Sequence, residues 1–121
     1  TNRSAVYFAF GSSALTAKAK RVLRAVAKEI KANPAVSSVR IAGYADRVGS
    51  AMANEKLSKR RADRVRRYLM AKGVVNAQVV ETRWFGDSVP ATSCKAGLPK
   101  AELVSCLQPD RRVEIEVDAA R

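Results

Sequence analysis

Arg61 is the residue whose type and position most strongly suggest chemistry. Apolar residues at spacings of three and four predict a helix over residues 51–71 with one apolar face. Arg61 falls in the middle of that face, four residues after Leu57 and four before Val65. An inward-pointing guanidinium must be paired or must line a pocket, because an unpaired buried charge is costly. Two interpretations stay open: a structural arginine that bonds a local acid or backbone carbonyls, and an arginine that binds a ligand.

Asp46 is the natural candidate for the partner of Arg61. It lies in a predicted loop over residues 45–50, just before the helix that carries Arg61. Ligands of open α/β sheets bind at that edge, although an aspartate there can also simply stabilise the loop or the helix start. One arginine and one acid at a pocket can hold a zwitterion, because the arginine binds its carboxylate and the aspartate binds its ammonium.

Catalysis has few routes in this sequence. The chain has no histidine, which excludes a Ser-His-Asp triad, a histidine base and a histidine-bearing metal site. Lysine is a conceivable base, yet no activated pair of nucleophile and base can be assembled, and no GxGxxG or P-loop motif is present. We therefore expect a domain that is not an enzyme and that needs no metal or cofactor.

The elements that must position these residues follow from the apolar pattern. Their order is βαβαβ, then a long loop and a final strand, which predicts one α/β domain (an α+β sandwich) over residues 1–121. We expect a mixed parallel and antiparallel sheet with both long helices packed on one face. The predicted strands cover residues 6–10, 38–44, 78–85 and 112–117, and the helices cover residues 15–31, 51–71 and, in a short stretch, 101–106.

The charge balance predicts an anionic partner or environment. Lys and Arg number 23 against 11 acidic residues, for a net charge of +12, while 47% of the 121 residues are hydrophobic. Nucleic acid, an anionic membrane surface, an acidic cell-wall polymer and plain solubility would each explain this charge. Only 6% of the chain is aromatic and no nucleic-acid-binding motif is present, so solvated helix faces are the simpler explanation of the basic runs.

Cys94 and Cys106 stand twelve residues apart in the last third of the chain. They fit either a pair of reduced thiols or a disulfide in an oxidising compartment, and the spacing alone does not decide between them. The chain starts without a signal-peptide pattern, as expected of a mature or excised domain.

Four motifs, in order, resemble the OmpA-like peptidoglycan-binding domain family, which includes Pal lipoproteins and flagellar MotB. The first motif is VYFAFGSSAL at residues 6–15. The second is GYADRVGS at residues 43–50, and the third is Asn54 followed by LSKRRADRV at residues 57–65. The chain closes with PDRRVEIEV at residues 109–117, and the cysteine pair before that motif is most similar to the OmpA periplasmic domain within the family.

The resemblance implies a periplasmic domain of a Gram-negative outer-membrane or envelope protein. Such a domain binds peptidoglycan through the diaminopimelate of stem peptides, with Asp46 on its ammonium and Arg61 on its carboxylate. A disulfide between Cys94 and Cys106 is implied as well. The remaining implied contacts come from Gly11 and Ser12 after the first strand, from Val48, Gly49 and Asn54 along the groove, and from Arg111, which would brace the pocket loops.

The sequence departs from the family pattern at a few positions. Ala45 stands where a threonine is usual, Gly11 where Asn or Asp often stands, and Trp84 where a glycine is common. The net charge is also high, which we interpret as attraction to anionic cell-wall or lipopolysaccharide surfaces. The alternative function is a basic adaptor that binds nucleic acid, anionic lipid or lipopolysaccharide through its Lys- and Arg-rich helix faces. We expect no nucleic acid, and a homodimer stays open.

Overall fold

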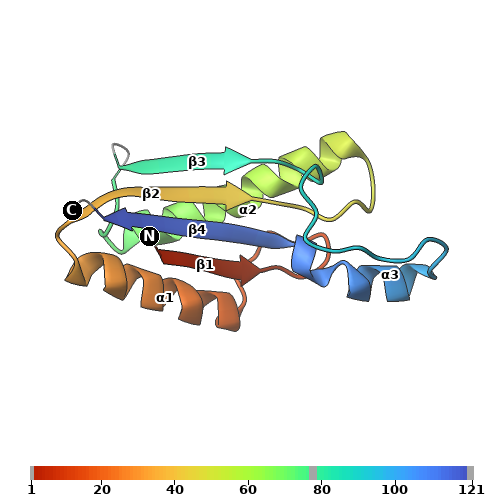
Figure 1. The fold of residues 1–121 in the computed structure, drawn as a ribbon, viewed down its shortest axis with the longest axis horizontal. Coiled ribbons are helices and arrows are strands. Elements are labelled where there is room, and N and C mark those ends of the chain that lie inside the picture. The colour runs from red at the N-terminus through yellow and green to blue at the C-terminus, as the bar shows by residue number, and fades with distance from the viewer. Residues whose placement is uncertain (1, 77–78, 120–121) are drawn as a thin grey trace.

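The protein is a four-stranded mixed sheet covered by two long helices (Figure 1). The computed structural model describes residues 2–76 and 79–119. In chain order, the elements are β1 (Asn2–Tyr7), α1 (Ala17–Ala32), β2 (Val36–Gly43), α2 (Ala51–Ala71), β3 (Val80–Trp84), α3 (Lys100–Cys106), a short 3₁₀ helix (Gln108–Asp110) and β4 (Arg112–Ala119).

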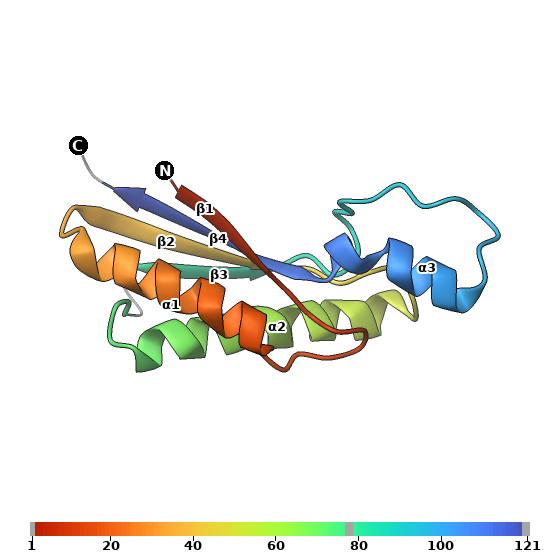
Figure 2. The ribbon, with the colours of Figure 1, turned by 90° about the horizontal axis from the view of Figure 1, so that it is seen from below.

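The sheet has the strand order β1-β4-β2-β3. The last strand, β4, is antiparallel to both of its neighbours, whereas β2 and β3 are parallel. Helices α1 and α2 lie side by side on one face of the sheet (Figure 2). The predicted mixed sheet with both long helices on one face is therefore confirmed.

The core lies between that sheet face and the helices. Alternate residues of β2 and β4 point toward the helices, as the two-residue period of a strand requires. Each long helix starts at a side-chain cap: the hydroxyl of Thr16 accepts from the Ala19 amide, and that of Ser50 from the Ala53 amide. The buried apolar residues include Leu23, Val26 and Ile30 of α1, Ala62, Val65 and Leu69 of α2, and Val39, Ile41, Val113 and Ile115 of the sheet.

The predicted bounds hold well for α2, which spans residues 51–71, but the first strand is misplaced. Residues 6–10 were expected to form it, whereas β1 ends at Tyr7. Tyr7 pairs with Arg112, the first residue of β4, so no partner strand remains beyond it. Phe8 stays buried and its amide still donates to the Arg111 carbonyl at 2.9 Å. The third predicted strand starts at residue 78, which lies outside the described residues.

At Gly43, helix α2 lies very close to the sheet. A Cβ added to Gly43 would lie 2.1 Å from the carbonyl oxygen of Ser58. Both backbones belong to regular elements, so neither can shift cheaply. The Ser58 hydroxyl also accepts from the Gly86 amide at 2.9 Å, which ties the ends of β2 and β3 to the same turn of α2. This close packing fixes the distance between α2 and the sheet, and it therefore fixes the position of Arg61 relative to the sheet.

Gly43→Ala is therefore expected to lower the free energy of unfolding by about 2–3 kcal/mol, because the new methyl group overpacks this contact. Urea unfolding followed by circular dichroism measures the loss. Gly11→Ala is the matched control, because Gly11 has a positive φ of 67° but nothing within 4 Å of an added Cβ. The control is expected to lose about 1 kcal/mol from backbone strain alone. Equal losses in the two variants would contradict the packing explanation.

Cys94 and Cys106 form a disulfide, with 6.1 Å between their Cα atoms. The disulfide implied by the family resemblance is confirmed. Helix α3 has no buried residue of its own, so the segment between the cysteines gains little from apolar burial. The Asp110 carboxylate holds the chain just before this segment, where it accepts from the Ala91 amide at 2.7 Å and from the Thr92 hydroxyl at 3.0 Å.

Replacing both cysteines with serine is expected to cost about 3 kcal/mol of stability, because the unfolded chain regains the entropy of an open loop. Urea unfolding of C94S/C106S, with and without a reducing agent, measures the effect. The reducing agent should lower the stability of the native chain to that of the variant and leave the variant unchanged. A variant as stable as the oxidised native chain would show that the disulfide does not hold α3.

Candidate functional site

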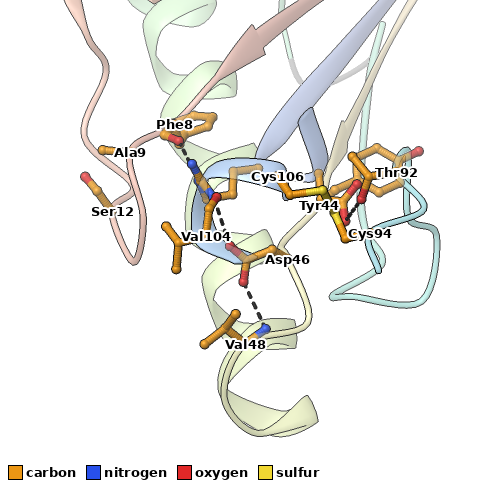
Figure 3. Close-up of polar contacts among 12 residues, drawn as sticks. Phe8, Ala9, Ser12, Tyr44, Asp46, Val48, Thr92, Cys94, Val104 and Cys106 are labelled. Carbon is orange, nitrogen blue, oxygen red and sulfur yellow. Dashed lines mark hydrogen bonds and ion pairs between the residues drawn. A yellow bond between two sulfur atoms is a disulfide. The ribbon is translucent and has the colours of Figure 1, made fainter. Parts of the chain in front are cut away.

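The candidate site lies at one end of the sheet, where three chain segments meet. The loop that follows β1, the loop that follows β2 and the residue that precedes β4 come together there (Figure 3). These segments bring Ser12, Asp46, Val48 and Arg111 together with Arg61, which helix α2 contributes, into one polar cluster.

Arg61 is fully buried, with 0% of its surface exposed. Its guanidinium donates to three backbone carbonyls: Nε to Ser12 at 2.8 Å, Nη1 to Tyr44 at 3.0 Å and Nη2 to Ala9 at 3.3 Å. The group also lies 5.2 Å from the centre of the Phe8 ring. The inward direction of Arg61 is confirmed, and its observed partners are backbone carbonyls.

Burial lowers the pKa of Arg61 to about 10, and the nearby Asp46 carboxylate opposes that shift. Arg61 is therefore protonated at neutral pH. Because a guanidinium has five N–H donors and three are engaged here, two donors remain for another acceptor.

Asp46 pairs with Arg111, and our expectation of a direct pair between Asp46 and Arg61 is wrong. Only 5% of the Asp46 surface is exposed. Its Oδ2 lies 3.2 Å from Arg111 Nη1, and its Oδ1 accepts from the Val48 amide at 3.0 Å. Figure 3 shows the Asp46 carboxylate bonded to the Val48 amide. The carbonyls of two loops surround Arg61, while Arg111 reaches Asp46 from the start of β4.

Arg111 joins three parts of the site. In addition to Asp46, it donates from Nε to the Phe8 carbonyl at 3.1 Å and from Nη1 to the Val104 carbonyl at 2.8 Å. The first contact reaches the end of β1 and the second reaches α3. Since only 6% of Arg111 is exposed, these bonds form in a region shielded from water.

The other predicted site residues lie around this cluster at different depths. Ser12 contributes its carbonyl to Arg61, and Gly11 next to it is exposed. Asn54 is buried, but its side chain donates to Asp87 at 3.0 Å and is not bonded to the central cluster. Gly49 has a φ of 97°, and a Cβ there would lie 3.8 Å from Asn54 Oδ1.

Sequence reasoning missed an aromatic and cationic layer beside the cluster. The rings of Tyr44 and Phe85 stack with centroids 5.4 Å apart, and the Arg112 guanidinium lies 3.8 Å from the Tyr44 ring centre. Arg112 also donates from Nε to Glu114 at 2.7 Å. Burial, and to a lesser degree Glu114, raises the pKa of Tyr44, so its phenol is neutral at physiological pH. The doubled arginine at the start of β4 was the only sequence signal for this layer.

The sequence pattern of the OmpA family matches residues 7–102 of this chain. The chain belongs to the OmpA family. It is 40% identical over 120 residues to outer membrane protein A of Yersinia pseudotuberculosis, covering 97% of this chain and 34% of that protein. It is also 39% identical to outer membrane protein P5 of Haemophilus influenzae, covering 98% of this chain and 33% of that protein. The chain thus spans about a third of the length of these relatives.

Solved structures of two other proteins share the fold. The peptidoglycan-associated lipoprotein of Burkholderia pseudomallei superposes with a TM-score of 0.77 at 26% identity, covering 94% of this chain and 89% of that one. The C-terminal domain of Helicobacter pylori MotB superposes with a TM-score of 0.73 at 21% identity, covering 99% of this chain and 86% of that one. At this identity, the likeness supports the fold and nothing further.

Membership of the OmpA family bears on two expectations from the sequence, the absence of catalysis and the location of the domain. Domains of this family are non-enzymatic, so the expectation of a non-catalytic domain is confirmed. The relatives also place the chain in the periplasm, as a domain of an envelope protein. None of the helices in the described part of the chain is long and apolar enough to cross a membrane.

Proposed function

We propose that this domain anchors an envelope protein to peptidoglycan, without a covalent bond, by holding the diaminopimelate of a stem peptide. The observation that carries the proposal is the buried cluster of Asp46, Arg61 and Arg111 at the end of the sheet. Membership of the OmpA family and the likeness to a peptidoglycan-associated lipoprotein support it.

The free end of diaminopimelate carries an ammonium and a carboxylate on one carbon, so a matching site needs one acid and one forked cation. Asp46 uses two of its roughly four acceptor positions for Val48 and Arg111, which leaves room to accept from an ammonium. Arg61 has two N–H donors left for the carboxylate. The cluster of two cations and one acid carries an excess positive charge, which attracts that carboxylate.

Access to Arg61 requires the loop after β1 to move, because Ala9 and Ser12 cover the guanidinium with their carbonyls. Gly11 lies between those two residues in a left-handed conformation that a glycine adopts without strain. Once that loop has moved, the ligand carboxylate accepts from the two N–H groups of Arg61 that no carbonyl engages. Because both partners of this contact are charged, it favours the moved position of the loop.

Arg111 positions Asp46 in this proposal. It holds the carboxylate from one side while the Val48 amide holds it from the other, so the acid is oriented before the ligand arrives. In this proposal, the rest of the stem peptide lies on the side of the cluster where Gly49 and Asn54 are found. The bond from Asn54 to Asp87 fixes that side.

Co-sedimentation with purified sacculi tests the anchoring role. We expect the domain to pellet with sacculi at both about 0.1 M and about 0.5 M salt, because recognition in a buried cluster is screened little. Free diaminopimelate should release it, whereas free lysine should not. A domain that pellets only at low salt, and that soluble polyanions release in place of diaminopimelate, would instead bind as the basic adaptor.

A further inference from the structure

The positive charge of this domain is concentrated on its two long helices. Helices α1 and α2 carry thirteen of the 23 Lys and Arg residues but only three of the 11 acidic residues. Both helices lie on the same face of the sheet (Figure 2), so one side of the molecule holds most of the net charge of +12.

On the opposite face of the sheet, the cations form ion pairs with acidic residues. Arg3 and Arg40 both pair there with Glu116, and Arg83 pairs with Glu81 at 2.5 Å. By contrast, among the described residues no cation of the solvent-facing side of α1 or α2 forms an ion pair with an acid. The charge of the helix side is therefore not neutralised within the domain.

A groove of about 500 Å³ concentrates these unpaired cations between the two helices. No acidic side chain lines it; Asp63 is near, on the turn of α2 before Arg67, and its carbonyl accepts from Arg67 Nε at 3.4 Å. The Lys72 ammonium lies 5.3 Å from the centre of the Tyr68 ring at one side. The polar lining consists of Lys20, Arg24, Arg64, Arg67, Lys72 and Tyr68, which we call the cationic groove.

Five like charges around one hollow repel one another, so an anion that bridges them gains more there than on an ordinary basic surface. Three of the five are arginines, whose forked donors match the oxygens of a phosphate group. We propose that the cationic groove docks the phosphate headgroups of an anionic phospholipid surface. The periplasmic location favours a membrane leaflet over nucleic acid, because the periplasm is bounded by two membranes.

This docking is independent of the stem-peptide site. The Asp46 cluster lies where β1 and β2 end and β4 begins, whereas the cationic groove opens between the helices on the side away from the sheet. One domain can therefore contact the cell wall with one surface and a membrane with another. Such an arrangement would hold the membrane and the cell wall at a fixed spacing.

Vesicle co-sedimentation tests the proposal with phosphatidylglycerol vesicles and, for comparison, neutral phosphatidylcholine vesicles. The groove variant removes four groove charges (K20Q, R24Q, R64Q and R67Q). The matched control removes four charges from exposed positions of the same two helices outside the groove (R21Q, K28Q, K31Q and K56Q). Both variants have the same net charge, so any difference between them reports the groove itself.

We expect the native domain to bind phosphatidylglycerol and not phosphatidylcholine. The partition coefficient onto phosphatidylglycerol vesicles should fall at least about tenfold for the groove variant and less than about threefold for the control. Equal losses in the two variants, or no binding to anionic vesicles, would overturn the proposal. Tighter binding to a DNA duplex than to the vesicles would assign the groove to nucleic acid and overturn it as well. Sacculus binding by the groove variant should stay intact, which separates this result from a failure of the anchoring function.

Discussion

Arg61→Ala is expected to abolish measurable binding of a diaminopimelate stem peptide, a loss of at least about a hundredfold in affinity. The alanine removes the only forked donor proposed for the ligand carboxylate. It also leaves the carbonyls of Ser12 and Tyr44 without the Arg61 donor, whereas the Ala9 carbonyl keeps its bond from the Ser12 amide, and the loss should lower the free energy of unfolding by about 3 kcal/mol. Isothermal titration calorimetry and urea unfolding measure the two effects.

Arg61→Lys separates the two consequences of the alanine variant. Lysine keeps a positive charge in the core but presents a point charge in place of a planar fork. The lysine variant should regain part of the lost free energy of unfolding. Its affinity for the peptide should remain low, because one ammonium cannot donate to the carbonyls and to the ligand carboxylate at the same time. A lysine variant with native affinity would show that charge alone is needed. An alanine variant with native affinity would remove Arg61 from the binding site.

Asp46→Asn is expected to weaken stem-peptide binding by about thirtyfold or more, because the ligand ammonium loses its only charged partner in the cluster. The amide oxygen can still accept from the Val48 amide, so the loop should keep its shape. The buried cations Arg61 and Arg111 then lack a neutralising charge between them, which should also lower the free energy of unfolding. Titration calorimetry at several salt concentrations measures the affinity.

Asp118→Asn is the matched control for Asp46→Asn. Asp118 lies near the far end of β4 and pairs with Arg40 at 2.7 Å, so the same chemical change there removes an ion pair away from the site. Its affinity for the peptide should be within about twofold of the native value. If the two variants bind equally well, Asp46 does not contact the ligand.

The burial of Arg61 was predictable from the sequence, because the apolar residues of α2 recur at helical spacing and Arg61 lies in the middle of that apolar face. The bounds of α2 follow from the same pattern and from the Ser50 cap. The partner of Arg61 was not predictable. Asp46 is adjacent in the fold but bonds to Arg111, which is 65 residues away in the sequence, and no local pattern reports such a contact.

The end of β1 shows a second limit of sequence patterns. Phe8 and Phe10 have high strand propensity, yet a strand ends where its partner ends. The start of β4 at Arg112 is set by the preceding 3₁₀ helix, which comes from the other end of the chain. Propensity therefore identified the strand correctly, and the tertiary pairing fixed its last residue.

Titration of the domain with two stem peptides tests the central claim most directly. One peptide ends in diaminopimelate, and the other carries lysine at the same position, which keeps the ammonium and lacks the carboxylate beside it. The proposal predicts saturable binding of the first peptide that persists at about 0.5 M salt, with at least about tenfold weaker binding of the second. Equal affinities for the two peptides, or binding that disappears with salt, would contradict recognition by the Asp46 and Arg61 cluster.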